Sequence, residues 1–239
     1  MTARSFFANL FETFKKNPVT TVLIWLNILV FLVEIVLGIA SENSTVLSLL
    51  GRGFAATDLA RWGGLWPALV KYDQSWWRLV SSMFLHGGLL HVASNLFVLH
   101  LLGRPLEDTI GWWRHLFIYM LSGLGGGLAV VFLGAQNSVT IGASGAIYGI
   151  IGALLYITFQ EPHWFPPASV RSIRTLMVLN LMFTFLIPGV SIAGHLGGLA
   201  IGVLAMIALM PKTPWWQRRR RRYDHGYETV LDGEAEYVD

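Results

Sequence analysis

The stretch TIGASGAIYG, from Thr140 to Gly149, surrounds one serine, Ser144, with small residues at the head of an apolar segment. A second stretch, GHLGGLAIG from Gly194 to Gly202, repeats glycine every four residues and carries His195. The glycines of the two stripes are Gly142, Gly145, Gly149 and Gly152 in the first, and Gly194, Gly198 and Gly202 in the second. Small-residue stripes let helix backbones approach closely in a membrane. The two stretches are therefore expected to pack together, either as a structural seam or to bring a nucleophile to a base.

The composition places the chain among membrane proteins. Hydrophobic residues make up 54% of its 239 residues and charged residues only 13%, whereas soluble domains carry about 25% charged residues. The chain has no cysteine, which excludes disulfides, thiolate catalysis and thiolate metal sites. No secretory signal peptide is expected, because the first apolar run is long enough to span a bilayer. The predicted fold class is an all-α polytopic membrane protein.

Six apolar runs are predicted to be transmembrane helices. A bilayer core requires about 20 apolar residues per helix, and the fifth run is shorter than this. The runs are Val19–Ala40, Leu85–Leu102, Trp112–Leu133, Ile141–Phe159, Ile173–Ile187 and Ile192–Met210. Together they form a predicted domain over residues 18–210, between an N-terminal segment (1–17) and a charged tail (211–239).

Lys and Arg residues are distributed unevenly between the two sides of the membrane. With the N-terminus inside, most of them fall on the inner side, and the exceptions lie in the first outer loop, about residues 41–84. Both termini are therefore expected in the cytoplasm, and the membrane is expected to be a plasma membrane. The outer loop is rich in Trp, which prefers the membrane interface, so the loop is expected to associate with the membrane. Beyond the last span, Arg218–Arg222 either fixes this topology or binds anionic lipid, and the acidic residues that follow are typical of disorder.

Polar side chains from three predicted spans meet at one depth near the outer face. In this orientation His91, Ser144 and His195 fall within about two turns of the outer ends of their spans. Asn95 lies one turn below His91 on the same helix face. Polar groups at membrane depth are costly and point to functional sites. Glu34, inside the first span, has no role assigned by its position.

These groups suit acyl transfer. Neutral His195 can accept the proton of Ser144, whose hydroxyl then attacks a carbonyl carbon. The developing oxyanion needs preorganised donors, for which the candidates are the backbone N–H of Ser144, the side-chain amide of Asn95, and His91. No Asp or Glu occurs in the second, fourth or sixth predicted span, so a Ser–His dyad is expected and a triad is not.

Taken singly, these residues have other interpretations. Ser144 can bond an upstream carbonyl, and His195 can join two helices by a hydrogen bond. His91 with Asn95 can form a polar clasp between helices. A metal site built from His91, His195 and His86, which opens the second predicted span, would lack a carboxylate or thiolate. No metal and no other cofactor are therefore expected.

Four separated motifs, in this order, resemble those of the rhomboid intramembrane serine proteases. They are WWRLVSSMFLH with Trp77 and Arg78, HVASN with His91 and Asn95, GASG followed by Tyr148, and GHLGGLAIG with His195, Gly198 and Gly202. The resemblance covers about residues 18–210. One departure is Gly194, where the family usually has alanine before the histidine, and it puts the tightness of the helix at that point in question.

This resemblance implies a six-helix rhomboid-like bundle with assigned roles. Ser144 and His195 would form the catalytic dyad, and the oxyanion hole would consist of His91, Asn95 and the Ser144 amide. Tyr148 would pack against the catalytic histidine, and the Trp-Arg pair would stabilise a membrane-embedded outer loop. The residues implied to support the site are Gly142, Gly145, Tyr148, Gly198, Gly202, Trp77 and Arg78. The implied activity is cleavage of single-span transmembrane proteins near their outer end, among membrane lipid and with no nucleic-acid partner.

Two other functions compete with an active protease. A rhomboid-like pseudoprotease would bind transmembrane clients without cutting them, but such proteins usually lose the serine or the histidine, and both are present here. A channel or transporter would need polar residues that continue toward the cytoplasmic side, whereas the polar groups of this chain gather near one end of the spans.

Overall fold

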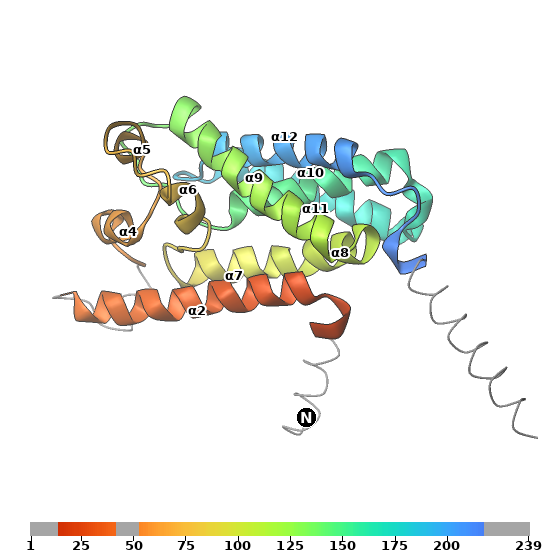
Figure 1. Ribbon diagram of the computed structural model, residues 1–239, viewed down its shortest axis with the longest axis horizontal. Helices are drawn as coiled ribbons and strands as arrows, with labels where there is room; N and C mark the ends of the chain where they lie inside the picture. The colour runs from red at the N-terminus through yellow and green to blue at the C-terminus, as the bar shows by residue number, and fades with distance from the viewer. Residues whose placement is uncertain (1–13, 42–52, 218–239) are drawn as a thin grey trace, which may run out of the picture.

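The computed structural model describes residues 14–41 and 53–217; the arginine run Arg218–Arg222 and the acidic tail lie outside the described residues. Within these ranges five helices are long and apolar enough to cross a membrane. They are α2 (Pro18–Ala40), the continuous Leu89–Ile110, α9 (Trp112–Leu133), α11 (Pro167–Leu186) and α12 (Ile192–Leu209). A shorter apolar helix, α10 (Ser144–Gln160), lies among them (Figure 1). The all-α polytopic class is confirmed, but six spans stay a prediction, because α10 has 17 residues and a crossing needs about 20.

The second predicted span, Leu85–Leu102, is wrong at its N-terminal end. The helix α7 (Leu89–Val98) begins only at Leu89, because Gly88 takes a φ of +154°, which is far from helical values and accessible mainly to glycine. His86 therefore lies in the loop that leads into the helix and not within the span.

The same span is also wrong at its C-terminal end. After α7 the chain passes through a π-helical turn, η1 (Leu99–Gly103), and continues as α8 (Arg104–Ile110). Pro105 stands at the start of α8. A proline inside a helix lacks an N–H and crowds the carbonyl four residues before it, and a π-helical turn is a common local adjustment. The helix thus extends well beyond the polar residues that end the apolar run.

The fourth and fifth spans differ from the prediction at their starts. The helix α10 begins three residues after Ile141, because Gly142 has a φ of +112°. The helix α11 begins at Pro167, ahead of the predicted Ile173. It includes Arg174, whose Nη2 donates to the carbonyl of Thr158 at 2.6 Å. This bond gives the guanidinium a partner at the end of the bundle, so the charge does not end the helix.

The bundle centres on α10, which packs closely against α9 and α12. Space for an alanine methyl is missing along this contact: a Cβ on Gly198 would lie 2.0 Å from the Gly145 carbonyl oxygen, and one on Gly202 would lie 2.1 Å from that of Gly149. The glycine stripes of α10 and α12 therefore face one another with their backbones in contact. Gly142 is not part of this contact, because it precedes the helix and its open side faces His91.

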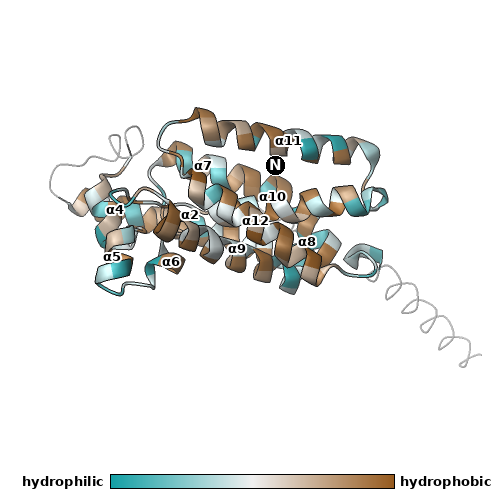
Figure 2. Ribbon diagram, turned by 90° about the horizontal axis from the view of Figure 1, so that it is seen from above, coloured by the Kyte–Doolittle hydropathy of each residue, from teal (hydrophilic) through white to brown (hydrophobic). Residues whose placement is uncertain are grey.

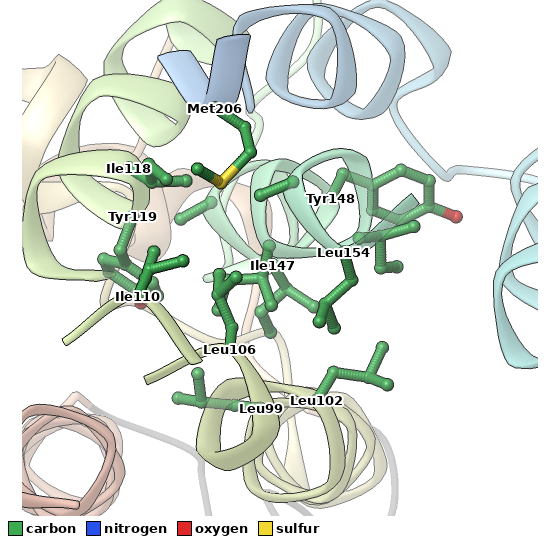
Figure 3. Packing of buried hydrophobic residues seen from close by; sticks show 14 of the residues in the cluster. Leu99, Leu102, Leu106, Ile110, Ile118, Tyr119, Ile147, Tyr148, Leu154 and Met206 are labelled. Atoms are coloured by element: carbon green, nitrogen blue, oxygen red, sulfur yellow. The ribbon is translucent and has the colours of Figure 1, made fainter. Parts of the chain in front are cut away.

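A hydrophobic core fills the space between these helices and the second span. Figure 3 shows Leu99, Leu102 and Leu106 of the second span directed toward side chains of α9, α10 and α12. Many of the remaining large apolar side chains are exposed on the outside of the helices, which appear largely brown in Figure 2. Such an apolar exterior suits a lipid environment.

Two buried carboxylates hold α2 against the second span. At its first turn, Glu107 of α8 accepts hydrogen bonds from the backbone N–H groups of Val19 (2.9 Å) and Thr20 (2.8 Å) and from the Thr20 hydroxyl (2.7 Å). These are N–H groups that a helix cannot satisfy within itself. Toward the other end of α2, Glu34 accepts from the backbone N–H of His86 at 2.9 Å. The position left without a role by the sequence therefore serves to attach the loop before α7.

The predicted first outer loop contains three short helices, α4 (Ala56–Trp62), α5 (Pro67–Tyr72) and α6 (Arg78–Ser81), at one end of the bundle (Figures 1 and 2). Arg78 joins them, since its Nη1 donates to the carbonyls of Ala60 (2.6 Å) and Gly64 (2.9 Å). Its guanidinium also lies over the Trp77 ring, 4.7 Å from the centroid. Burial lowers the pKa of Arg78. The part of the predicted loop at residues 42–52 lies outside the described residues.

Candidate active site

Ser144 is the first residue of α10, and the segment before it is held by backbone hydrogen bonds to the predicted outer loop. Thr140 forms an antiparallel bridge with Leu65, with N–H···O distances of 2.9 and 2.8 Å. The N–H of Gly142 donates to the Ser82 carbonyl at 2.8 Å. Because Ser144 begins the helix, its own N–H has no carbonyl partner within the helix and lies at the positive end of the helix dipole.

His195 lies in the first turn of α12, directly opposite this serine. The helix start is capped by Ser191, whose Oγ accepts from the N–H of Gly194 at 3.2 Å. The Nε2 of His195 lies 2.8 Å from Ser144 Oγ. The Tyr148 ring stacks on the imidazole, with centroids 4.1 Å apart and an interplanar angle of 16°. The geometry is therefore that of a hydrogen-bonded serine and base, with the base held from one face.

The other nitrogen of His195 contacts a residue that the sequence reasoning missed. Nδ1 lies 2.9 Å from the hydroxyl of Thr184 on α11. The Thr184 hydroxyl also donates to the Asn180 carbonyl at 3.1 Å and is hydrogen-bonded to the Tyr148 hydroxyl. The available signal was the spacing of Asn180 and Thr184, which are four residues apart in an apolar helix and so share one face.

His91 lies beside Ser144 with an N–H available. Its Nδ1 accepts from the backbone N–H of Gly87 at 3.2 Å, so the neutral ring carries its proton on Nε2. A Cβ built on Gly142 would lie 2.8 Å from His91 Nε2 and 3.8 Å from Ser144 Oγ. The bare Cα of Gly142 thus lets the imidazole N–H reach the neighbourhood of the serine.

Asn95 is arranged differently. Its Nδ2 donates to the carbonyl of His91, one turn earlier in the same helix, at 2.8 Å. Its Oδ1 is buried and has no hydrogen-bond partner among the described residues. One of the two N–H groups of the Asn95 amide is therefore already used within its own helix.

A small cavity adjoins the two reacting side chains. Its volume is about 30 Å³, and its lining includes Ser144, His195, Gly142, Ser191 and Val130. This space is sufficient for one water molecule.

The remaining histidines of the outer end do not form a metal site. The rings of His86 and His91 meet edge to face with centroids 5.1 Å apart. The Nδ1 of His86 is bonded to the Phe84 carbonyl at 3.1 Å. Across the described residues no group of three His, Cys, Asp or Glu side chains is placed to hold a metal ion.

Gly194, the departure from the usual alanine, sits in a confined space. A Cβ there would lie 3.1 Å from the Ser191 hydroxyl and 3.2 Å from a methyl group of Val130. Both distances are short for carbon contacts, so an alanine would press on the cap of α12. Glycine at this position keeps the cap and the close helix contact together.

A family model described as the Rhomboid domain matches residues 73–212, more than half of the chain. The chain belongs to the rhomboid family. The resemblance drawn from the four motifs is therefore confirmed, and this rhomboid is an all-α multi-pass membrane protein.

Several curated rhomboid proteins are similar to it. Rhomboid protease GluP of Bacillus subtilis is 36% identical over 145 residues, which cover 60% of this chain and 28% of the relative. RHOMBOID-like protein 6, mitochondrial, of Arabidopsis thaliana is 34% identical over 179 residues, covering 73% of this chain and 57% of the relative. Rhomboid-type serine protease 2 of Emericella nidulans is 32% identical over 138 residues, covering 56% of this chain and 27% of the relative. The chain thus spans less than two thirds of the length of each of these relatives.

Proposed function

We propose that this rhomboid is an intramembrane serine endopeptidase that cleaves single-span transmembrane proteins near the outer ends of their helices. The observation that carries the proposal is the 2.8 Å contact between Ser144 Oγ and His195 Nε2. The two residues are brought together by helices that meet at Gly198 and Gly202, where there is no room for a side chain. Proteases among the similar proteins agree with this activity.

The reaction follows from the hydrogen bonds. Neutral His195 accepts the Ser144 proton at Nε2 as Oγ attacks the scissile carbonyl carbon. The N–H of Ser144 and the Nε2–H of His91 stabilise the negative charge on the carbonyl oxygen. Asn95 contributes its second amide N–H. His195 then returns the proton to the leaving amine, and a water molecule, deprotonated by the same histidine, releases the acyl group from Ser144.

The membrane orientation supports attack near the outer face. We propose that both termini are cytoplasmic, because this orientation places most Lys and Arg residues on the inner side, and that the membrane is a plasma membrane. Among the described residues, Lys15 and Lys16 lie just before α2, and Arg104 and Arg114 lie at the starts of α8 and α9. Ser144 and His195 lie at the starts of α10 and α12, toward the opposite end, where α4 and α5 are found (Figure 1). The outer loop beside the dyad then contacts the interface, where water is available.

Cleavage by purified variants tests the proposal. The wild type, Ser144→Ala and His195→Ala are incubated in detergent with a model single-span substrate, and Ser138→Ala, which alters an exposed serine, serves as the control. Wild type and control are expected to cleave, and the two dyad variants are not. Equal cleavage by wild type and Ser144→Ala refutes the proposal, as does binding of a substrate panel without any cleavage. Fluorophosphonate labelling of Ser144 in wild type, and its loss in His195→Ala, tests the activation of the serine directly.

A further inference from the structure

We propose that Thr184 is a positioning residue that holds His195 in the tautomer required to accept the Ser144 proton. The proposal rests on the Ser144–His195 dyad proposed above. Thr184 is 2% exposed, and its hydroxyl lies 2.9 Å from His195 Nδ1. It comes from α11, so the reactive pair depends on a third helix besides α10 and α12.

The hydrogen bonds around this hydroxyl assign its role. A threonine hydroxyl has one hydrogen to donate and two lone pairs to accept with. The Thr184 hydrogen is directed to the Asn180 carbonyl, 3.1 Å away. The Tyr148 hydroxyl likewise donates its one hydrogen to the Asn180 carbonyl. The lone pairs of Thr184 are therefore free to accept from His195 Nδ1. An N–H on Nδ1 leaves Nε2 unprotonated, which is the form that can accept the proton of Ser144.

The opposite tautomer would disrupt this arrangement. With the proton on Nε2, the imidazole could not act as a base toward Ser144, and Nδ1 would need a donor. Thr184 would then have to turn its hydrogen away from Asn180 and toward Nδ1. The Tyr148 ring stacked on the imidazole opposes a compensating tilt of the histidine.

A neutral hydroxyl in this position also suits the membrane. In soluble serine hydrolases an acidic side chain accepts the second imidazole N–H and fixes the tautomer. A carboxylate buried among membrane helices is costly unless it is fully bonded. The two buried carboxylates described above, Glu34 and Glu107, are bonded to other parts of the chain. Thr184 thus supplies the acceptor without adding a charge.

The contact of Thr184 with His195 also helps to attach α11 to the bundle. Among the described residues, hydrogen bonds between α11 and other helices occur at two places: Arg174 to Thr158 near its start, and the cluster of Asn180 and Thr184 with Tyr148 and His195. The second attachment point of α11 is therefore the dyad itself.

The test replaces the hydroxyl while keeping the shape of the side chain. Thr184→Val removes the acceptor, and Thr184→Ser keeps it. Thr158→Val is the matched control, because Thr158 is a buried threonine whose hydroxyl bonds only the Leu155 carbonyl of its own helix. The measurements are kcat and KM for a model transmembrane substrate, the rate of fluorophosphonate labelling at Ser144, and the thermal unfolding temperature.

We expect Thr184→Val to lower kcat and the labelling rate by about 10-fold to 100-fold, with KM changed less than about twofold, since loss of the correct tautomer slows the chemical step. Thr184→Ser is expected to restore most of the rate, and Thr158→Val to react at about the wild-type rate. Unchanged kcat in Thr184→Val refutes the positioning role, and so does a Thr184→Ser variant as slow as Thr184→Val. Wild-type activity that survives Ser144→Ala would instead overturn the proposed dyad.

Discussion

The substitution Gly198→Ala should separate the two reacting side chains without touching either of them. The new Cβ would lie 2.0 Å from the Gly145 carbonyl oxygen, whereas carbon–oxygen contacts settle at about 3.3 Å. The backbones of α10 and α12 must therefore move apart by about 1 Å. Since Ser144 and His195 lie on these helices near the same level, their 2.8 Å contact should lengthen to about 4 Å, beyond hydrogen-bonding range.

The expected loss of activity is large and the loss of stability moderate. A displacement of about 1 Å in a catalytic arrangement can reduce turnover about 100-fold. Overpacking of a tight contact costs about 1–3 kcal/mol of unfolding free energy. The assay compares turnover of a model substrate and fluorophosphonate labelling with the thermal unfolding temperature of each variant in the same detergent.

The facing glycine provides the control for stability. A Cβ on Gly145 would lie 3.5 Å from the Gly194 carbonyl oxygen, which is an ordinary contact. Gly145→Ala should therefore unfold at or above the wild-type temperature, because alanine favours the helix by about 1 kcal/mol over glycine. Wild-type labelling of Ser144 in Gly198→Ala would show that the glycine contact does not set the distance between serine and histidine.

Three further substitutions test other contacts of the site. Tyr148→Phe keeps the ring stacked on His195 but removes the hydroxyl bond to α11, so turnover should fall about threefold to tenfold in a substrate assay; a larger loss than in Tyr148→Ala would contradict this division of roles. Glu34→Ala leaves the N–H of His86 without its carboxylate and should lower unfolding free energy by about 1–3 kcal/mol, read from thermal melts; an unshifted melt would deny Glu34 its anchoring role. Arg78→Met keeps the aliphatic part of the side chain and removes the donors to the carbonyls of Ala60 and Gly64. Limited proteolysis should therefore cut the outer loop sooner than in wild type, and equal digestion would contradict the role of Arg78 in holding the loop together.

The parts of the fold that follow from local composition were predictable. The span Trp112–Leu133 has the same ends in sequence and structure, because the apolar run is bounded by Gly111 and Gly134. The C-terminal end of the second span was not predictable, because a charged residue such as Glu107 is typical of the end of a membrane helix when it is considered alone. Its carboxylate is satisfied by the first turn of α2, a contact between residues far apart in the sequence.

The residues of the candidate site also differ in how far the sequence predicts them. Ser144, His91 and His195 were accessible because each is an isolated polar group at one depth in an apolar run. Thr184 was not singled out, because a threonine can satisfy itself on its own helix and only the fold reveals that its hydroxyl faces the imidazole. The orientation of the Asn95 amide toward the His91 carbonyl also depends on backbone geometry that residue spacing does not specify.

The bridge between Leu65 and Thr140, with the bond from Gly142 to Ser82, makes the outer loop one wall of the nucleophile's support. In the orientation proposed above, a reagent that binds this loop from the aqueous side would act on the backbone leading to Ser144 without having to enter the lipid. Antibody fragments or cyclic peptides selected against the segment from α4 to α6 offer a route to inhibitors that do not compete with a substrate helix for the bilayer.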